Sequence, residues 1–370
     1  MLHFINASLR ALLKLAAANA LPQELFDPKI EIGRSKELFK SYVKHFEIEH
    51  HSYCNRTCWF CPNSVVDRKS VNLRMNKKTL LKIFSQLAEI DYDQSIIWGG
   101  YGEPLSDETI FDDIRMARDM LPHVYQRLYS NGDYLTAEVV RRLEAAGLDQ
   151  LRVSLYPESD RDLEMPKLLK SLEDRTGLKI ATKTREYDGV QLIGSSFLIL
   201  VEVKDFRAKH MFSRGGALLK ESGQEAYART LLCFSPIQHL SVAYDGQCML
   251  CCQVRPDVKE HQSAIVGNLN DEHYSIFHYY RDLALSREVL LCSGIKKGVC
   301  TSCNFNPFGA GPYKLGRMGS LSKILNKIPG SKAFVNYLWL FPRMDRERYK
   351  QRGDGGEDYC DPGTAHQKCS

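Results

Sequence analysis

The sequence predicts an α/β protein, built on a partial barrel of parallel strands and followed by a small cysteine-rich module. Short apolar runs alternate with helical patterns through residues 46–203, which indicates repeated strand–helix units. Seven of the twelve cysteines lie within residues 233–303, where the alternation stops. At 370 residues with 44% hydrophobic and 26% charged residues, the chain can form one large domain with an appendage.

The strand and helix patterns define the expected barrel. Strand-like runs occupy residues 46–50, 95–98, 126–129, 150–155, 178–182 and 197–203. Helical patterns lie between or after them at 76–90, 106–120, 136–146 and 158–174. Such repetition implies a parallel sheet with right-handed crossovers. Six strands are too few for a closed eight-stranded barrel, so we expect a partial (β/α)6 TIM-like barrel with its chemistry at the C-terminal strand ends.

The remaining segments differ from the barrel in composition. Leu2, Ile5, Leu9, Leu12 and Leu13 recur at helical spacing, which predicts an amphipathic helix near the start of the chain. Residues 320–350 have a helical pattern, and the polar tail beyond them is of the disordered type. The predicted organisation is an N-terminal helical extension, the barrel, the cysteine module, a helical segment and a disordered tail, at 1–43, 44–210, 211–310, 311–350 and 351–370.

Composition and charge exclude several classes of protein. The net charge of +5 is mild and its cations are spread along the chain, so we expect neither nucleic-acid nor membrane binding. Arg10 and Lys14 interrupt the first apolar stretch, which therefore lacks the pattern of a secretory signal. No apolar run reaches 18 residues. We expect a cytoplasmic protein, where clustered cysteines bind metal or do redox chemistry.

The first cysteine cluster is Cys54, Cys58 and Cys61, with the spacing C-x3-C-x2-C. Three thiolates this close can bind three irons of one [4Fe–4S] cluster and leave the fourth iron open to a ligand. The alternative is a zinc knuckle, with its fourth ligand supplied by His50 or His51 just upstream.

Phe60, directly before the third cysteine, completes the pattern C-x3-C-x-aromatic-C, which resembles the signature of the radical S-adenosylmethionine (SAM) superfamily. Further stretches at successive strand ends resemble the same family: 98–105, 129–132 and 153–155. The resemblance implies that this set of residues binds SAM, with Glu103 facing its ammonium group: Phe60, Gly100, Gly102, Glu103, Ser130, Asn131 and Ser154.

The resemblance also implies a mechanism. SAM would bind the open iron, and an electron from a donor such as flavodoxin or ferredoxin would cleave it to methionine and a 5′-deoxyadenosyl radical. That radical would abstract a hydrogen atom from the substrate, while the protein orients and shields the reacting groups.

The second cysteine set has the layout C-x12-G-x4-C … C-x2-C, which resembles the auxiliary-cluster modules named SPASM and, in shortened form, twitch. No further cysteine stands between Cys303 and Cys360, so the chain resembles the twitch form with one auxiliary [4Fe–4S] cluster. The implied ligands are Cys233, Cys251, Cys300 and Cys303, with Cys252 as a rival to its neighbour. Cys248 and Cys292 are expected to be packing cysteines, and a four-cysteine zinc site is the alternative for the module.

A fully ligated auxiliary cluster cannot bind substrate, which favours a role as electron acceptor in a two-electron oxidation. The cluster layout and chain length resemble family members that oxidise an alcohol of a cyclitol to a ketone. We therefore expect a dehydrogenase for a sugar or aminocyclitol-type small molecule in natural-product biosynthesis. Arg214, in a Ser-Arg-Gly-Gly stretch before the module, is a candidate substrate contact, and a solvated surface turn is its alternative reading.

Two other functions remain open from the sequence. One is a radical enzyme that modifies a peptide or protein, like the sulfatase-maturating enzymes or those that make ribosomal peptide products. Only about 45 residues precede the first predicted strand, which is short for a peptide-recognition domain. The other is a non-catalytic zinc-binding protein, which leaves the glycine and polar motifs at the strand ends without a purpose.

Overall fold

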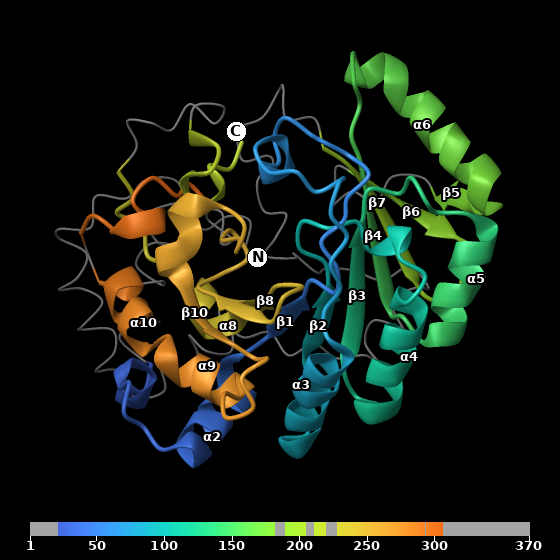
Figure 1. Cartoon of the computed structure of the whole chain (residues 1–370). Helices are drawn as coiled ribbons and strands as arrows, with labels where there is room; N and C mark the ends of the chain where they lie inside the picture. Colours follow the sequence, from blue (N-terminus) through green and yellow to red (C-terminus); the bar gives the residue numbers. More distant parts are fainter. Residues whose placement is uncertain (1–20, 182–188, 205–210, 220–227, 293, 306–370) are drawn as a thin grey trace, which may run out of the picture.

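The computed structural model describes residues 21–181, 189–204, 211–219, 228–292 and 294–305 (Figure 1). In these residues ten strands form one sheet in the order β10-β9-β8-β1-β2-β3-β4-β7-β6-β5. The strands, in chain order from β1 to β10, are His45–Ile48, Ser95–Trp98, Tyr125–Ser130, Gln150–Leu155, Lys179–Ala181, Gly189–Ile193, Leu198–Val203, His239–Val242, Gln247–Met249 and Ile265–Asn268.

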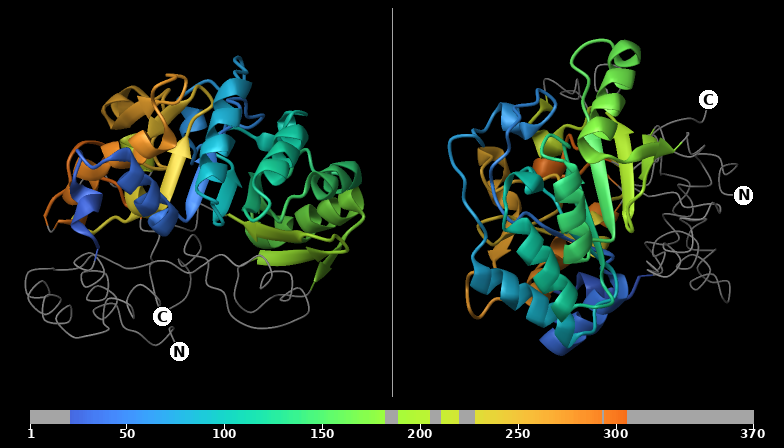
Figure 2. Two further views of the ribbon diagram at one scale, coloured as in Figure 1. Left: turned by 90° about the horizontal axis from the view of Figure 1, so that it is seen from below. Right: turned by 90° about the vertical axis from the view of Figure 1, so that its right-hand side faces the viewer.

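The middle of the sheet is a run of six parallel strands, β8-β1-β2-β3-β4-β7, in which every neighbouring pair is parallel. Seen from below, the strands form a curved row, with α3, α4 and α5 along one side (Figure 2). Because all six strands point the same way, the loops after β1, β2, β3 and β4 meet at one edge. The predicted α/β fold with a partial parallel barrel is therefore confirmed.

One predicted barrel strand was wrong. The run at 178–182 becomes β5, which pairs antiparallel with β6 at the edge of the sheet, and β7 takes the place beside β4. A parallel strand buried on both faces reads as a continuous apolar run. Leu198–Val203 begins with such a run, whereas Lys179–Ala181 is short and partly exposed.

The sixth parallel strand comes from the region that the sequence assigns to the cysteine module. β8 pairs with β1 from His45↔His239 to Ile48↔Val242. The strands β9 and β10 extend the same sheet by antiparallel pairing. The barrel and the cysteine-rich region therefore share a sheet, although the sequence predicts them as separate units.

The four predicted barrel helices are present as α3 (Lys77–Glu89), α4 (Ile110–Met120), α5 (Ala137–Ala146) and α6 (Arg161–Thr176). Each of the first three buries an apolar face, as its helical spacing of apolar residues predicts. Side chains cap α3 and α5 at their N-termini, and a glycine in the left-handed conformation ends α5.

On the other side of β1, the helix α2 (Ile32–Tyr42) packs against α9 (Ile276–Asp282). The ring of Phe39 meets those of Phe277 and Tyr280 edge-on, with centroids 5.6 and 5.5 Å apart. The helices α8 (Ser235–Gln238) and α10 (Ala284–Leu291) complete this side (Figure 1). Early and late parts of the chain thus share one hydrophobic core.

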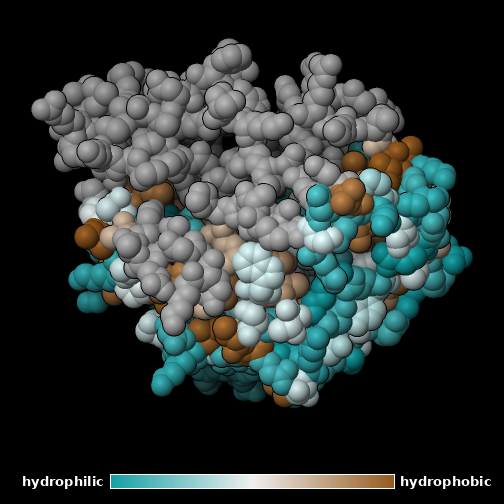
Figure 3. Space-filling model, turned by 90° about the horizontal axis from the view of Figure 1, so that it is seen from above, coloured by the Kyte–Doolittle hydropathy of each residue, from teal (hydrophilic) through white to brown (hydrophobic). Residues whose placement is uncertain are grey.

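Several predictions concern residues outside the described ranges: the amphipathic helix near the start, the helical segment 311–350 and the tail. Among the described helices, none has the length and apolar character needed to cross a membrane. Seen from above, hydrophobic groups lie among hydrophilic ones on the described surface (Figure 3). Exposed apolar side chains include Trp59, Val65, Val71 and Leu73 in the loop after β1.

Candidate active site

The three cysteines of the first cluster lie in the long loop between β1 and α3. Backbone hydrogen bonds shape this loop: the amide of Cys61 donates to the carbonyl of Cys58 at 2.9 Å, and that of Cys54 to Arg68 at 3.1 Å. Burial, with the neighbouring thiols, raises the pKa values of Cys54 and Cys58 to about 11. Thiolates held this close repel one another, so a cationic cluster is the natural partner of this loop.

The two histidines upstream of the cysteines have other neighbours. His50 and His51 gather with Asp107, their ligand atoms all within 4.8 Å of one another, and His51 Nε2 lies 3.0 Å from the hydroxyl of Ser106. Burial lowers the pKa of His50 to about 3 and that of His51 to about 4, which keeps both neutral. This arrangement does not favour either histidine as the fourth ligand of a zinc knuckle.

The glycine-rich loop after β2 lies against the end of β1. Its amides at Tyr101 and Gly102 both donate to Glu49 Oε1, at 2.8 and 3.0 Å. Gly100 has a φ of +102°, and a Cβ there would lie 2.8 Å from Glu49 Cβ. A Cβ on Gly102 would come within 2.4 Å of the carbonyl oxygen of His51. The glycines therefore permit a close approach that brings the loop beside the cysteines.

Glu103, which ends this loop, brings three predicted site residues together. It is buried, and its carboxylate accepts hydrogen bonds from the Ser130 hydroxyl at 2.6 Å, the Asn131 amide at 2.7 Å and the Leu105 amide at 3.1 Å. Burial raises the pKa of Glu103 to about 7, and these hydrogen bonds oppose that rise. No Lys or Arg of the described chain forms an ion pair with Glu103, so a ligand ammonium would be its counter-charge.

The turn after β3 is tied directly to the cysteine loop. Asn131 Nδ2 donates to Asn55 Oδ1 at 2.8 Å, and Asn55 in turn donates to Asp133 at 2.7 Å. Arg56 Nε also donates to Asp133, at 2.6 Å. These contacts fix the distance between Glu103's partners and the cysteines.

Phe60 and Ser154 both contact Tyr156, which directly follows β4. The ring of Phe60 lies 4.8 Å from that of Tyr156, centroid to centroid, and Ser154 hydrogen-bonds the Tyr156 hydroxyl. Of the residues predicted to bind SAM, all seven therefore lie on the loops after β1, β2, β3 and β4 or at their ends.

Arg214 is directed toward this site. Its guanidinium lies 6.0 Å above the ring of Tyr101, and Nη1 is 3.4 Å from Gln253 Oε1. Its charge acts on the thiols of Cys61 and Cys252, so it stands near both cysteine regions. A φ of +49° at this non-glycine residue turns the chain to place the side chain there. This placement differs from that of a solvated surface turn.

The second cysteine set converges from distant parts of the chain. Burial is the main cause that raises the pKa of both adjacent thiols. The thiols of Cys300, Cys233 and Cys303 also act on Cys251, whereas the largest charge acting on Cys252 is that of Glu47. These neighbours, together with the grouping of Cys252 with Glu47 and His239, favour Cys251 as the fourth member of the set.

Two buried cations support this set. Arg229 donates to the carbonyls of Cys303 and Phe305 at 2.8 and 2.6 Å, and Lys296 donates to the carbonyls of Val289 and Cys292. Of the two cysteines predicted to serve packing, Cys248 is buried in the core but Cys292 is exposed, so the second prediction was wrong. Cys292 follows the last turn of α10, beyond the helix face that packs on the core.

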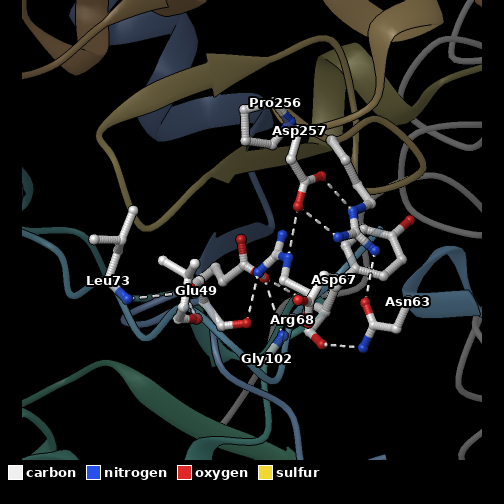
Figure 4. Close-up of polar contacts among 12 residues, drawn as sticks. Glu49, Asn63, Asp67, Arg68, Leu73, Gly102, Pro256 and Asp257 are labelled. Atoms are coloured by element: carbon white, nitrogen blue, oxygen red, sulfur yellow. Dashed lines mark hydrogen bonds and ion pairs between the residues drawn. The ribbon is translucent and has the colours of Figure 1, made fainter. Parts of the chain in front are cut away.

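A buried ionic network joins the cysteine loop to the region after β9. Arg68 lies between two carboxylates, with Nη1 3.1 Å from Glu49 and Nε 2.6 Å from Asp257 (Figure 4). Arg255 also pairs with Asp257 at 2.6 Å, and donates to Asn63 at 2.7 Å. Asn63 lies just after the third cysteine, so the network connects both cysteine regions.

The sequence motifs do not identify the residues of this network, which are Glu49, Arg68, Arg255 and Asp257. They also do not identify Gln253, which lies beside Arg214. One signal was available: His45, Glu47 and Glu49 alternate with Phe46 and Ile48 along the first strand. Such alternation indicates two different faces, and the polar face is the one that meets the site. Nothing local in the sequence marks Arg68 or Asp257 as partners, because they are 189 positions apart.

The donor sets fit the groups that the sequence implies. Three thiols with one buried, unpaired carboxylate suit a three-cysteine cluster with a SAM ammonium beside it.

Comparison with known proteins agrees with this site. Residues 48–180 match the family model of the Radical SAM superfamily. These residues are a radical SAM domain.

Among curated proteins the chain is similar to the S-adenosyl-L-methionine-dependent 2-deoxy-scyllo-inosamine dehydrogenase of Niallia circulans. The two are 26% identical over 262 residues, which are 70% of this chain and 91% of the dehydrogenase. The fold is similar to that of BtrN in complex with AdoMet and 2-DOIA, with a TM-score of 0.50 and 22% identity over 71% of this chain and 93% of BtrN.

Proposed function

We propose that this radical SAM enzyme oxidises an alcohol of a sugar or aminocyclitol-type small molecule to a ketone. The observation that carries the proposal is the 26% identity to an aminocyclitol dehydrogenase, which extends over 91% of that enzyme. Because the match spans 262 residues, it extends well beyond residues 48–180, which match the radical SAM domain.

The first site would bind SAM through a defined set of residues. Cys54, Cys58 and Cys61 would hold a [4Fe–4S] cluster and leave one iron for SAM. Glu103, placed by Ser130 and Asn131, would face the ammonium group of SAM. When bound, the cluster and SAM supply a 5′-deoxyadenosyl radical that takes a hydrogen atom from the substrate. Phe60 and Tyr156 would shield this region from water.

The second cysteine set would act in the last step of the reaction, the removal of an electron from the substrate radical. We propose that Cys233, Cys251, Cys300 and Cys303 hold an auxiliary [4Fe–4S] cluster within the module assigned to residues 211–310. Four protein ligands leave no iron for substrate, so the proposed role is electron acceptor. Converting the alcohol to the ketone removes one hydrogen atom, one electron and one proton, and the auxiliary cluster would take the electron. The nearby charges of Arg229 and Lys296 favour a reduced cluster.

The substrate would lie between the two cysteine regions. Arg214 stands there, beside Gln253 and close to the thiol of Cys61. A guanidinium and a carboxamide can together donate to and accept from hydroxyl groups, which suits a polyhydroxylated ring. A small-molecule substrate, a flavodoxin or ferredoxin as electron donor, and a cytoplasmic location complete the proposal.

The test is turnover by anaerobically reconstituted enzyme that contains about eight irons per chain. With a reductant, SAM and a panel of cyclitols, aminocyclitols and sugars, we expect 5′-deoxyadenosine and a ketone in equal amounts. Cys300→Ala should still release 5′-deoxyadenosine but form no ketone, whereas Cys58→Ala should do neither. Release of 5′-deoxyadenosine with no alcohol in the panel oxidised, or full ketone formation by Cys300→Ala, would contradict the proposal.

A further inference from the structure

Most of the buried carboxylates in the described part of the chain pair with an arginine. Those of the described residues that are buried are Glu47, Glu49, Glu103, Asp107 and Glu202. Three of them form ion pairs with arginine: Glu49 with Arg68, Asp107 with Arg74, and Glu202 with Arg152. Glu103 and Glu47 form none with Lys or Arg. A buried charge needs compensation, and Glu103 would obtain it from SAM. Glu47 has His239 as an ion-pair partner at 3.1 Å, and that ring is a cation only when it is protonated, so a metal ion bound to both would supply a permanent positive charge.

Glu47 lies among groups that bind metals. Its Oε2 is 3.1 Å from His239 Nε2, and its Oε1 accepts a hydrogen bond from the Ser241 hydroxyl at 3.1 Å. The ligand atoms of Glu47, His239 and Cys252 all lie within 4.8 Å of one another. The three come from β1, β8 and the segment after β9, so the tertiary fold brings them together.

We propose that Glu47, His239 and Cys252 bind one divalent cation of the zinc class. Carboxylate oxygen, imidazole nitrogen and thiolate sulfur are the donors that zinc takes in proteins, and three protein ligands with a free fourth position is the catalytic type of site. Binding displaces the proton of the Cys252 thiol to solvent and requires the neutral His239 ring, with its remaining proton on Nδ1.

The spacing suits a single ion. Ligand atoms around tetrahedral zinc lie about 3.3–3.8 Å apart, close to the 3.1 Å that separates Glu47 and His239. Supporting contacts are present as well: Ser241 holds the second carboxylate oxygen, and the ring of His45 meets that of His239 edge-on at 5.6 Å. Such contacts orient ligands in metal sites.

The other histidine cluster suits an ion less well. Asp107, which stands with His50 and His51, is already paired with Arg74 at 2.6 Å. Its Oδ1 also accepts hydrogen bonds from the amide and hydroxyl of Thr109, at 3.0 and 2.9 Å. The positive charge of Arg74 replaces the one that a metal ion would bring.

The proposed ion would stand at the edge of the substrate region. The carbonyl of Cys252 accepts a hydrogen bond from the Tyr101 hydroxyl at 3.0 Å, and the charge of Arg214 acts on the Cys252 thiol. The free fourth position would take water or an oxygen of a bound small molecule. Metal binding itself does not depend on the proposed alcohol oxidation, so the two proposals can fail separately.

The test is metal analysis of the anaerobic holoenzyme with its iron content complete, after dialysis against stoichiometric zinc. We expect about one zinc per chain, and zinc-edge X-ray absorption with one sulfur at about 2.3 Å and nitrogen or oxygen ligands at about 2.0–2.1 Å. Cys252→Ser and Glu47→Gln should each lose at least tenfold in zinc affinity while iron content stays complete. The exposed Cys292→Ser is the matched control and should retain zinc.

Three results would overturn the proposal. One is a wild-type holoenzyme that binds no zinc. Another is a shell of three or four sulfurs around the zinc, which would place it on the cluster cysteines. The third is unchanged zinc affinity in both Cys252→Ser and Glu47→Gln. If either variant fails to fold, His239→Gln provides the second measurement, and unchanged affinity there counts equally against the site.

Discussion

At the scale of single residues, Glu103 gives the site a pH dependence. Burial raises its pKa to about 7, so the carboxyl group is protonated and neutral below that pH and charged above it. Only the charged form attracts an ammonium group. We therefore expect SAM affinity to rise with pH up to about 7 and then level off, with a loss approaching tenfold per pH unit on the acid side.

Isothermal titration of SAM into the anaerobic enzyme at several pH values would measure this effect. Glu103→Gln should bind SAM about 10–100-fold more weakly at pH 8, since it loses a charge-assisted contact, and its affinity should not vary with pH. Cluster absorption at each pH serves as the control for iron loss. A Glu103→Gln variant that keeps the wild-type pH profile would show that another group titrates.

Two adjacent cysteines offer a second test at this scale. Cys251 lies with Cys233, Cys300 and Cys303, whereas Cys252 lies with Glu47. We expect Cys251→Ala to lose about four irons per chain and Cys252→Ala to lose none. Iron analysis and electron paramagnetic resonance of the reduced proteins would measure this. The reverse result would assign the auxiliary cluster to Cys252.

The residues that the sequence could identify are those whose roles depend on local spacing. Cys54, Cys58 and Cys61 fall within one short loop, so their spacing alone indicates shared ligation. Glu49 and Arg68 contact the site just as directly, but their roles depend on partners that are distant in the chain. Pairing of that kind is a product of tertiary structure and leaves no local pattern.

At the scale of structural elements, the glycine-rich loop depends on contact with the end of β1. A Cβ on Gly102 would lie 2.4 Å from the backbone oxygen of His51, and backbone atoms cannot shift aside as the end of a flexible side chain can. We expect Gly102→Ala to lower the free energy of unfolding by about 1–3 kcal/mol and to weaken SAM binding. Denaturant unfolding and SAM titration would measure the two effects.

Gly99→Ala is the matched control for this loop. A Cβ on Gly99 would lie 3.4 Å from a methyl group of Ile97, which is close to ordinary contact. This variant should stay within about 0.5 kcal/mol of wild type and keep its SAM affinity. Equal damage from both substitutions would show that the loop tolerates no alanine at all, and that the approach to His51 is not the cause.

Helices were predicted better than strands because their signal is longer. Lys77–Glu89 presents three turns of apolar spacing, and such a pattern has few competing readings. Lys179–Ala181 is only three residues long, and its position in the sheet is set by its hairpin with Gly189–Ile193. His239–Val242 is as short as β1, and nothing in its four residues indicates the neighbour with which it pairs.

At the scale of the whole molecule, Arg68 links the SAM domain to the region of the second cysteine set. It is buried between Glu49 and Asp257, so its removal would leave Glu49 without a cation. We expect Arg68→Met to lower the free energy of unfolding by about 3–5 kcal/mol. Arg141→Met, which removes an exposed pair with Glu138, should cost less than about 1 kcal/mol. Chemical denaturation of cluster-free protein would compare them, and equal losses would contradict the structural role of the network.

The parallel pairing of β8 with β1 also dictates an order of events during synthesis. The strand beside β1 on this edge is separated from it by 194 positions, so β1 leaves the ribosome long before β8 exists. At 5–20 residues per second, that edge stays open for about 10–40 s. An open strand edge recruits other chains, and the three cysteines emerge during the same interval. During this interval, chaperone binding and the insertion of iron–sulfur clusters compete with aggregation, until β8 is synthesised and covers the open edge of β1.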